Sequence, residues 1–253
     1  MANSQGNPGF RNLMSLTRDD VKTVLNSVDI GKDWAAYAPK LSELCKIEDG
    51  KTGGVNPGDR RALFYLVRAF RPARVLEIGT HVGASTVHIA AALTDSTRDH
   101  FPRLLTVDIQ DENDSPLSFW RQAGLAKSPK QMIEELKGKI ETTFVTDDSR
   151  HFFANTKETF DFIFLDGDHA TEAVYEEIVS ALDVINKNGL IILHDYFPDG
   201  HALWSDASVV CGPFAATEKL RSTGAGIKLI PLGSLPWPTK FGSQVTSLAV
   251  IAR

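Results

Sequence analysis

Short apolar runs alternate with amphipathic stretches along the chain from residue 73 onward. The apolar runs are rich in β-branched and aromatic residues and have the length of strands: "RVLEIG", "LLTVDI", "TTFV", "FDFIFLD", "GLIILHD", "GIKLIPL" and "SLAVIAR". This alternation predicts a mostly parallel sheet covered by helices on both faces. A Pro- and Gly-rich segment, "GSLPWPTKFGSQ", joins the last two runs, which we expect to pair antiparallel.

The part of the chain before residue 56 has a different, weakly periodic pattern. Apolar residues have helical spacing around residues 21–28 and 34–44. The stretch "NPGDRRALFYLVRAFRP" then predicts a well-defined helix with Asn56 as its N-cap. We therefore divide the chain into an N-terminal helical extension or lid, residues 1–55, and an α/β domain, residues 56–253.

The composition is that of an ordinary globular protein, and it narrows the classes of partner. Of 253 residues, 42% are hydrophobic and 23% are charged, which suits one large α/β domain. The formal net charge of −5 argues against a nucleic-acid partner, because such a partner requires a basic face. The two cysteines have neither metal-site nor disulfide-framework spacing, and we find no signal peptide and no membrane-spanning segment. We expect a cytoplasmic protein without a membrane partner.

Candidate chemistry begins where the first predicted strand ends, in "LEIGTHVGAST". Gly79 and Gly83 let the backbone turn tightly and approach a ligand, and the amides that open the next helix would face that ligand. A dinucleotide fingerprint needs three glycines spaced G-x-G-x-x-G, which this loop does not have. The loop therefore favours a ligand without a pyrophosphate.

The next two strand ends carry polar residues suited to a nucleoside. Asp108 ends the second strand, 29 positions beyond Gly79 (108 − 79), where an acid can accept hydrogen bonds from both ribose hydroxyls. Asp148 and Ser149 follow the third strand and could bond an adenine edge or simply form a turn. Together with the glycine loop, the polar residues at these strand ends predict a nucleoside-binding site.

The segments "VLEIGTHVGAS", "VDI", "DDS", "FDFIFLDGDH" and "NGLIILHDY" resemble, in order and spacing, the class I S-adenosylmethionine-dependent methyltransferases over roughly residues 56–253. The resemblance implies a Rossmann-like sheet of seven strands, mostly parallel with the last one reversed. It implies that S-adenosyl-L-methionine is the cofactor. The cofactor-binding residues implied are Glu77, Gly79, Thr80, His81, Gly83, Ser85, Asp108, Asp148, Ser149 and Asp166.

A narrower resemblance is to the metal-dependent small-molecule O-methyltransferases of the catechol and natural-product sugar types. It implies a divalent-metal site at Asp166, His194 and Asp195, with separations of 28 and 29 positions (194 − 166 and 195 − 166). Mg²⁺ prefers carboxylate oxygens, whereas the imidazole of His194 suits Zn²⁺, Mn²⁺ or Fe²⁺ better, so the metal stays open. His194 could instead shape the pocket by hydrogen bonding, and the two acids could cap the helices that follow them.

The residues that follow the fourth strand supply the candidate base. The resemblance places a base at His169, with Asp168 as the alternative. The expected function is transfer of a methyl group to a hydroxyl of a small molecule of sugar or natural-product type. The alternatives are a metal-independent O- or N-methyltransferase with His169 as base, a nicotinamide-dependent dehydrogenase, and a non-catalytic nucleoside-binding domain. A homodimer is a further expectation that no interface pattern in the sequence supports.

Overall fold

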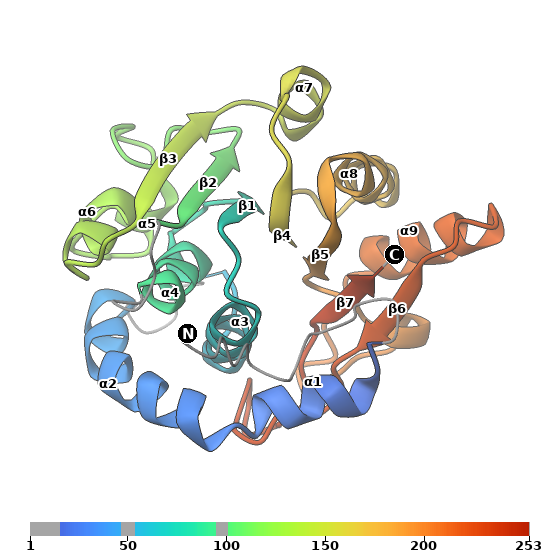
Figure 1. Ribbon diagram of the computed structural model, residues 1–253, viewed down its shortest axis with the longest axis horizontal. Helices are drawn as coiled ribbons and strands as arrows, with labels where there is room; N and C mark the ends of the chain where they lie inside the picture. Colours follow the sequence, from blue (N-terminus) through green and yellow to red (C-terminus); the bar gives the residue numbers. More distant parts are fainter. Residues whose placement is uncertain (1–15, 47–53, 95–100, 253) are drawn as a thin grey trace, which may run out of the picture.

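The computed structural model describes residues 16–46, 54–94 and 101–252 and contains a seven-stranded sheet with the order β3-β2-β1-β4-β5-β7-β6 (Figure 1). The strands are β1 (Arg74–Ile78), β2 (Arg103–Asp108), β3 (Glu141–Thr146), β4 (Phe160–Leu165), β5 (Ile185–Leu193), β6 (Lys228–Pro231) and β7 (Ala249–Ala252). Strands β1 to β5 pair in parallel, whereas β7 is antiparallel to both β5 and β6. The predicted mostly parallel sheet with a reversed last strand is confirmed.

Helices cover both faces of this sheet (Figure 1). The helices on one face are α1 (Arg18–Leu25), α2 (Val28–Leu44), α3 (Pro57–Phe70), α4 (Ala84–Leu93), α5 (Phe119–Gln122) and α6 (Pro129–Glu134). Those on the other face are α7 (Ser149–Asn155), α8 (Thr171–Val184) and α9 (Gly212–Ser222). A short 3₁₀ helix, η3 (Pro198–Gly200), lies between β5 and α9 in sequence.

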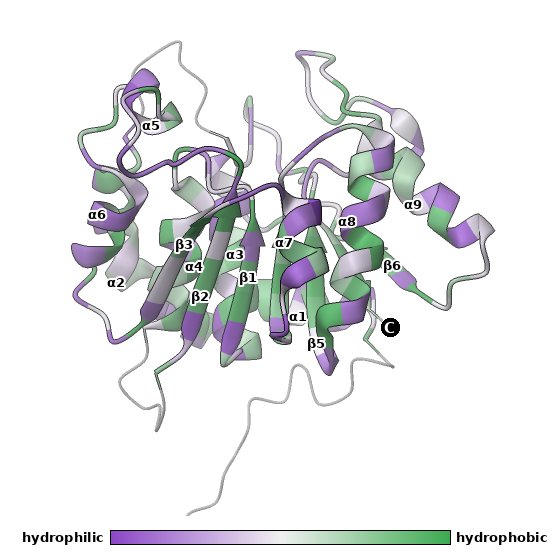
Figure 2. Ribbon diagram, turned by 90° about the horizontal axis from the view of Figure 1, so that it is seen from above, coloured by the Kyte–Doolittle hydropathy of each residue, from purple (hydrophilic) through white to green (hydrophobic). Residues whose placement is uncertain are grey.

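The strands in the middle of the sheet are mainly hydrophobic toward their carboxyl ends because both of their faces are covered (Figure 2). In β4, Phe162 and Phe164 pack into the hydrophobic cluster that contains α3 and α4. The alternate residues Ile163 and Leu165 pack into the cluster that contains α8 and α9. The period of two along the strand thus divides its side chains between two cores.

The N-terminal helices share the core of the domain. Helix α2 begins at Val28, before the predicted residue 34, because Ser27 caps it by accepting a hydrogen bond from the backbone N–H of Ile30. Leu25 and Leu41 are buried in the same cluster as α3 and α4. The domain boundary at residue 55 stays a prediction, and α2 ends at Leu44 with Cys45 as its C-cap. Among the described helices, none is both long and apolar enough to cross a bilayer.

Candidate active site

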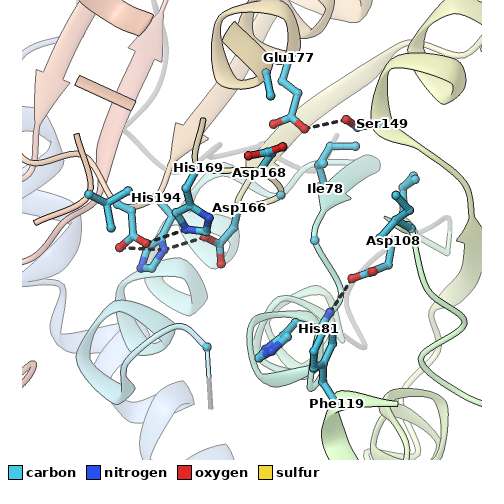
Figure 3. A pocket seen from close by; sticks show the side chains of 18 of the residues that line it. Ile78, His81, Asp108, Phe119, Ser149, Asp166, Asp168, His169, Glu177 and His194 are labelled. Atoms are coloured by element: carbon cyan, nitrogen blue, oxygen red, sulfur yellow. Dashed lines mark hydrogen bonds and ion pairs between the residues drawn. The ribbon is translucent and has the colours of Figure 1, made fainter. Parts of the chain in front are cut away.

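A cavity of about 850 Å³ opens at the carboxyl ends of β1, β2, β4 and β5 (Figure 3). Ten of the residues predicted for the site line it: Gly79, His81, Asp108, Asp148, Ser149, Asp166, Asp168, His169, His194 and Asp195. The parallel strands bring these ten residues together because their carboxyl ends meet at one edge of the sheet. Glu77, Thr80, Gly83 and Ser85 are not part of the lining.

The loop after β1 must begin with glycine. Gly79 has a φ of +96°, and a Cβ placed on it would collide with the backbone carbonyl oxygen of Asp166. The missing side chain therefore lets the tips of β1 and β4 lie against each other. Gly83, with a φ of +78°, precedes α4 and packs against Pro129 and Met132, which places it behind the cavity wall.

Glu77 supports the loop from inside the core. Its side chain is fully buried, and Oε2 accepts hydrogen bonds from the hydroxyls of Thr86 at 2.6 Å and Thr106 at 2.7 Å. The hydroxyls of Thr80 and Thr106 are also 2.6 Å apart, and Ser85 is buried beside them. Burial raises the pKa of Glu77 to about 7. The direct cofactor contact predicted for Glu77, Thr80 and Ser85 stays a prediction that the lining of the cavity does not support.

We expect Glu77→Gln to stabilise the protein at pH 8 and to have little effect near pH 4.5. Because the folded-state pKa is about 7 and the ordinary value is 4.5, this carboxyl's contribution to stability is complete below pH 4.5 and is lost as pH rises through 7. Glutamine accepts the same hydroxyls without a charge, and the gain is at most roughly 3 kcal/mol. Urea unfolding at both pH values measures it, with Glu134→Gln on the surface of α6 as control. Equal stability of Glu77→Gln and wild type at pH 8 would contradict the raised pKa.

Asp108 is held rigidly at the tip of β2. Its Oδ2 accepts the backbone N–H of His81 at 2.8 Å (Figure 3). Its Oδ1 accepts the backbone N–H of Gln110 at 3.1 Å. The ring of His81 packs against Phe119, with ring centroids 4.5 Å apart. Each carboxylate oxygen retains a further lone pair, so Asp108 can accept hydrogen bonds from vicinal hydroxyls in the cavity.

The tip of β3 contributes a helix cap and a hydroxyl. Asp148 caps α7 by accepting the backbone N–H groups of Arg150 and His151. The hydroxyl of Ser149 donates to Oε1 of Glu177 at 2.7 Å (Figure 3). Glu177 is a buried residue of α8 that lines the cavity, and burial raises its pKa to about 7. The sequence did not identify it, because nothing distinguishes it from other acids of an amphipathic helix.

Two histidine–carboxylate pairs lie beside the tips of β4 and β5. Nε2 of His169 is 2.9 Å from Oδ2 of Asp195, and Nδ1 of His194 is 2.8 Å from Oδ1 of Asp166. The hydrogen bond to Asp195 raises the pKa of His169, although burial opposes it. Burial would also lower the pKa of His194, but the charges of Asp166 and Asp195 outweigh it and hold that pKa well above its usual range. The end of the cavity is therefore an imidazole and carboxylate cluster.

This cluster contains a donor set for a divalent cation. The potential ligand atoms of Asp166, His169 and Asp195 all lie within 4.8 Å of one another. Two carboxylates and an imidazole fit such a cation. The imidazole in this group is that of His169 and not that of His194. Both ring nitrogens of His194 face carboxylates. The ligand role predicted for His194 stays a prediction.

The long connections form the remaining wall of the cavity. Phe119 comes from the connection between β2 and β3, and Phe197, Trp204 and Val210 come from the connection after β5. The rings of Phe197 and Trp204 meet edge to face at 5.5 Å. Lys240 also lines this wall. Aromatic residues of long connections more often anchor the loop to the body of a domain than line a pocket, but the structure shows that Phe119 and Trp204 reach the cavity.

The central part of the chain matches a known family. A family model described as a methyltransferase domain matches residues 76–196, the segment that carries Gly79, Asp108, Asp166 and Asp195. The chain contains a methyltransferase domain. The predicted assignment to the class I methyltransferases, which use S-adenosyl-L-methionine, is therefore confirmed. None of the curated proteins matches the chain.

Solved structures align with this methyltransferase over most of its length. Cofactor-bound Rv0187 from MTB is 19% identical, with 94% of this chain and 97% of that chain covered and a TM-score of 0.52. An O-methyltransferase from Bacillus cereus in complex with SAH is 18% identical, with 95% and 99% covered and a TM-score of 0.52. The O-methyltransferase TomG from Streptomyces achromogenes, in complex with SAM, is 17% identical, with 90% and 89% covered and a TM-score of 0.51. These similarities show that the methyltransferase shares their fold.

Proposed function

We propose that this methyltransferase transfers the methyl group of S-adenosyl-L-methionine to a hydroxyl of a small molecule of sugar or natural-product type. The observation that carries the proposal is the His169–Asp195 pair, which lies in the same cavity as Asp108. The similar fold of two O-methyltransferases supports oxygen as the acceptor atom. The site thus combines a nucleoside-binding acid with a base oriented by a carboxylate.

The cofactor is held by the strand tips in this proposal. Asp108 accepts the ribose hydroxyls, and Asp148 and Ser149 lie beside the adenine. The loop at Gly79 carries the methionine part past the tip of β4. The sulfonium methyl is then presented to the end of the cavity that contains Asp166 and His169.

The reaction is a direct displacement at the methyl carbon. The substrate hydroxyl gives its proton to His169 while its oxygen attacks the methyl carbon. The carbon–oxygen bond forms as the carbon–sulfur bond breaks. The electron pair of the broken carbon–sulfur bond stays on sulfur, so the products are a methyl ether and S-adenosylhomocysteine. Asp195 holds the ring of His169 in place. Asp168 is the second candidate base, although its Oδ1 already accepts the backbone N–H of Ala170 at 2.7 Å.

A divalent cation fits the same end of the cavity. Asp166 and Asp195 would hold it together with an imidazole, for which His169 and His194 are the two candidates. When bound, the cation supplies positive charge that lowers the pKa of a coordinated hydroxyl. Mg²⁺ is the expected ion for the two carboxylates, and Mn²⁺ or Zn²⁺ for a site that includes imidazole.

A metal-independent O- or N-methyltransferase is the second candidate function. The hydrogen bonds His169–Asp195 and His194–Asp166 favour it, because they satisfy the two carboxylates without a cation. Acceptor chemistry would then depend on His169 as base.

Calorimetric titration with S-adenosylmethionine and S-adenosylhomocysteine, with and without EDTA, tests the proposal. We expect micromolar or tighter binding of both nucleosides, followed by transfer of a labelled methyl group to hydroxylated acceptors in a screen. Activity that is lost with EDTA and restored by Mg²⁺, Mn²⁺ or Zn²⁺ would support the cation, and activity that survives EDTA would support the second candidate. Absence of binding by both nucleosides would contradict the cofactor assignment.

Asp108→Asn is expected to weaken S-adenosylhomocysteine binding by about 10- to 100-fold, because hydrogen bonds to a charged acceptor contribute about 1.5–3 kcal/mol. Calorimetry measures the change in Kd. Asp111→Asn is the matched control, since Asp111 also accepts two backbone N–H groups in the same loop but does not line the cavity. Equal affinity of both variants would place the ribose elsewhere.

A further inference from the structure

A buried carboxylate lies directly behind the catalytic cluster. Asp59 is the third residue of α3, and its side chain is 0% exposed. Asn56, the N-cap, donates its side-chain amide to Oδ2 of Asp59 at 2.8 Å and accepts the backbone N–H of Asp59 at 3.0 Å. An acid in the first turn of a helix is common, but such acids are ordinarily at the surface. Capping therefore does not account for the burial of Asp59.

The other neighbours of Asp59 belong to the active site. Its Oδ2 lies 3.4 Å from Nε2 of His194. The same oxygen lies 3.4 Å from the hydroxyl of Ser247, which is also 3.4 Å from Oδ1 of Asp195. Asp59 is thus connected to the tip of β5 by two contacts, one with the imidazole of His194 and one with the hydroxyl of Ser247.

His194 is held between carboxylates on both edges of its ring. Nδ1 faces Oδ1 of Asp166 at 2.8 Å and Oδ1 of Asp195 at 3.4 Å, whereas Nε2 faces Asp59. The ring of Phe164 meets it edge to face at 6.1 Å. The direction in which Nδ1 points into the cavity therefore depends on what holds Nε2.

Two polar atoms at this contact are buried and unsatisfied. Neither Oδ1 of Asp59 nor Nε2 of His194 has a hydrogen-bond partner within the described part of the chain. Buried polar atoms are nearly always paired, and each unpaired one calls for an explanation. A shortening of roughly 0.5 Å would bring Nε2 of His194 and Asp59 to ordinary hydrogen-bond length.

We propose that Asp59 is a positioning residue of the active site, which accepts a hydrogen bond from Nε2 of His194 and so directs Nδ1 at Asp166 and Asp195. Asp59 does not line the cavity and acts through the imidazole. A carboxylate that accepts from the far nitrogen of a site histidine fixes the orientation of the ring. Without it, the ring of His194 can turn and Asp166 loses its hydrogen-bond partner. This consequence for methyl transfer rests on the proposed function, whereas the contact itself does not.

Asp59→Asn tests the proposal in the full-length protein labelled with ¹⁵N-histidine. We expect the wild type to show an Nε2–H signal of His194, assigned by its loss in His194→Gln, and we expect Asp59→Asn to shift or lose that signal. Asp20→Asn is the matched control, because Asp20 is the third residue of α1 in an exposed capping box. Once an acceptor is known, kcat should fall by about 10- to 100-fold, with the Kd for S-adenosylhomocysteine within about twofold of wild type.

The outcomes separate the two proposals. An unprotonated Nε2 in the wild type, or a signal that Asp59→Asn leaves unchanged, would overturn the role of Asp59. If Asp59→Asn does not fold, two other measurements test the proposal. They are the Nε2–H signal of the wild type and the same signal in Asn56→Ser, which lacks the amide that donates to Asp59. A wild type that shows the Nε2–H signal but binds neither nucleoside would contradict the proposed function and leave the Asp59–His194 contact standing.

Discussion

His169→Gln is expected to lower kcat for methyl transfer by about 10²- to 10⁴-fold, the range that a positioned general base contributes. Glutamine cannot accept the substrate proton at neutral pH, although it is similar in size. The Kd for S-adenosylhomocysteine should stay near the wild-type value, because Asp108 and the loop at Gly79 lie on other strand tips. A labelled-methyl assay with the acceptor found in the screen measures the rate, and calorimetry measures the affinity.

The pH profile separates a base from a merely structural histidine. Since the hydrogen bond to Asp195 raises the pKa of His169, the wild-type rate should rise as pH passes through that raised pKa and the imidazole loses its proton. Asp195→Asn should move this rise to lower pH. His201→Gln, the same change at an exposed histidine of the connection after β5, is the control for the substitution. A His169→Gln variant with wild-type kcat would instead favour Asp168 as the base.

Gly79→Ala is expected to destabilise the protein by roughly 2–6 kcal/mol and to abolish binding of S-adenosylhomocysteine. The added methyl group would collide with the carbonyl oxygen of Asp166, and a side chain at a φ of +96° is strained even where there is space. Relief of the collision requires the tips of β1 and β4 to separate, which distorts the cavity between them. Urea unfolding and calorimetry measure the two effects.

Gly224→Ala isolates the part of this effect that comes from backbone strain. Gly224 also has a positive φ, +75°, but a Cβ there would meet no atom within 4 Å. We expect a loss of about 1–2 kcal/mol with unchanged nucleoside affinity. Similar losses for the two variants would mean that the strand tips can move apart freely, which would contradict the role given to Gly79.

The strands were predictable because burial on both faces requires continuous apolar runs. The exception is the start of β5, which extends back to Ile185 through the polar residues Asn186, Lys187 and Asn188. These residues follow α8 without a turn, and the pairing with β4 shifts register between Phe160 and Phe162. A strand that begins in polar sequence beside a register shift has no apolar pattern to reveal it. The start of α2 was missed for a similar reason, since Ser27 alone marks it.

The site residues that directly follow strands were predictable from the sequence. Residues that directly follow buried strands, such as Asp108 and Asp166, are positioned by the sheet, so the sequence places them at one edge. Asp59 and Glu177 lie on helices, and their approach to the cavity depends on how α3 and α8 dock on the sheet. Helical periodicity shows which face is buried but not which strand tip a buried acid will meet. This is why Asp59 was predicted only as part of a helix start.

The placement of β7 has a consequence for the protein's biosynthesis. This strand is made after the other six, yet it lies between β5 and β6. A nascent chain on the ribosome therefore carries β5 with one bare edge, and β6 without a neighbour, until the segment at residues 249–252 has emerged. Unpaired strand edges invite pairing with other chains. The interval before β7 is inserted is thus the stage of synthesis at which the edges of β5 and β6 are open to pairing with other chains.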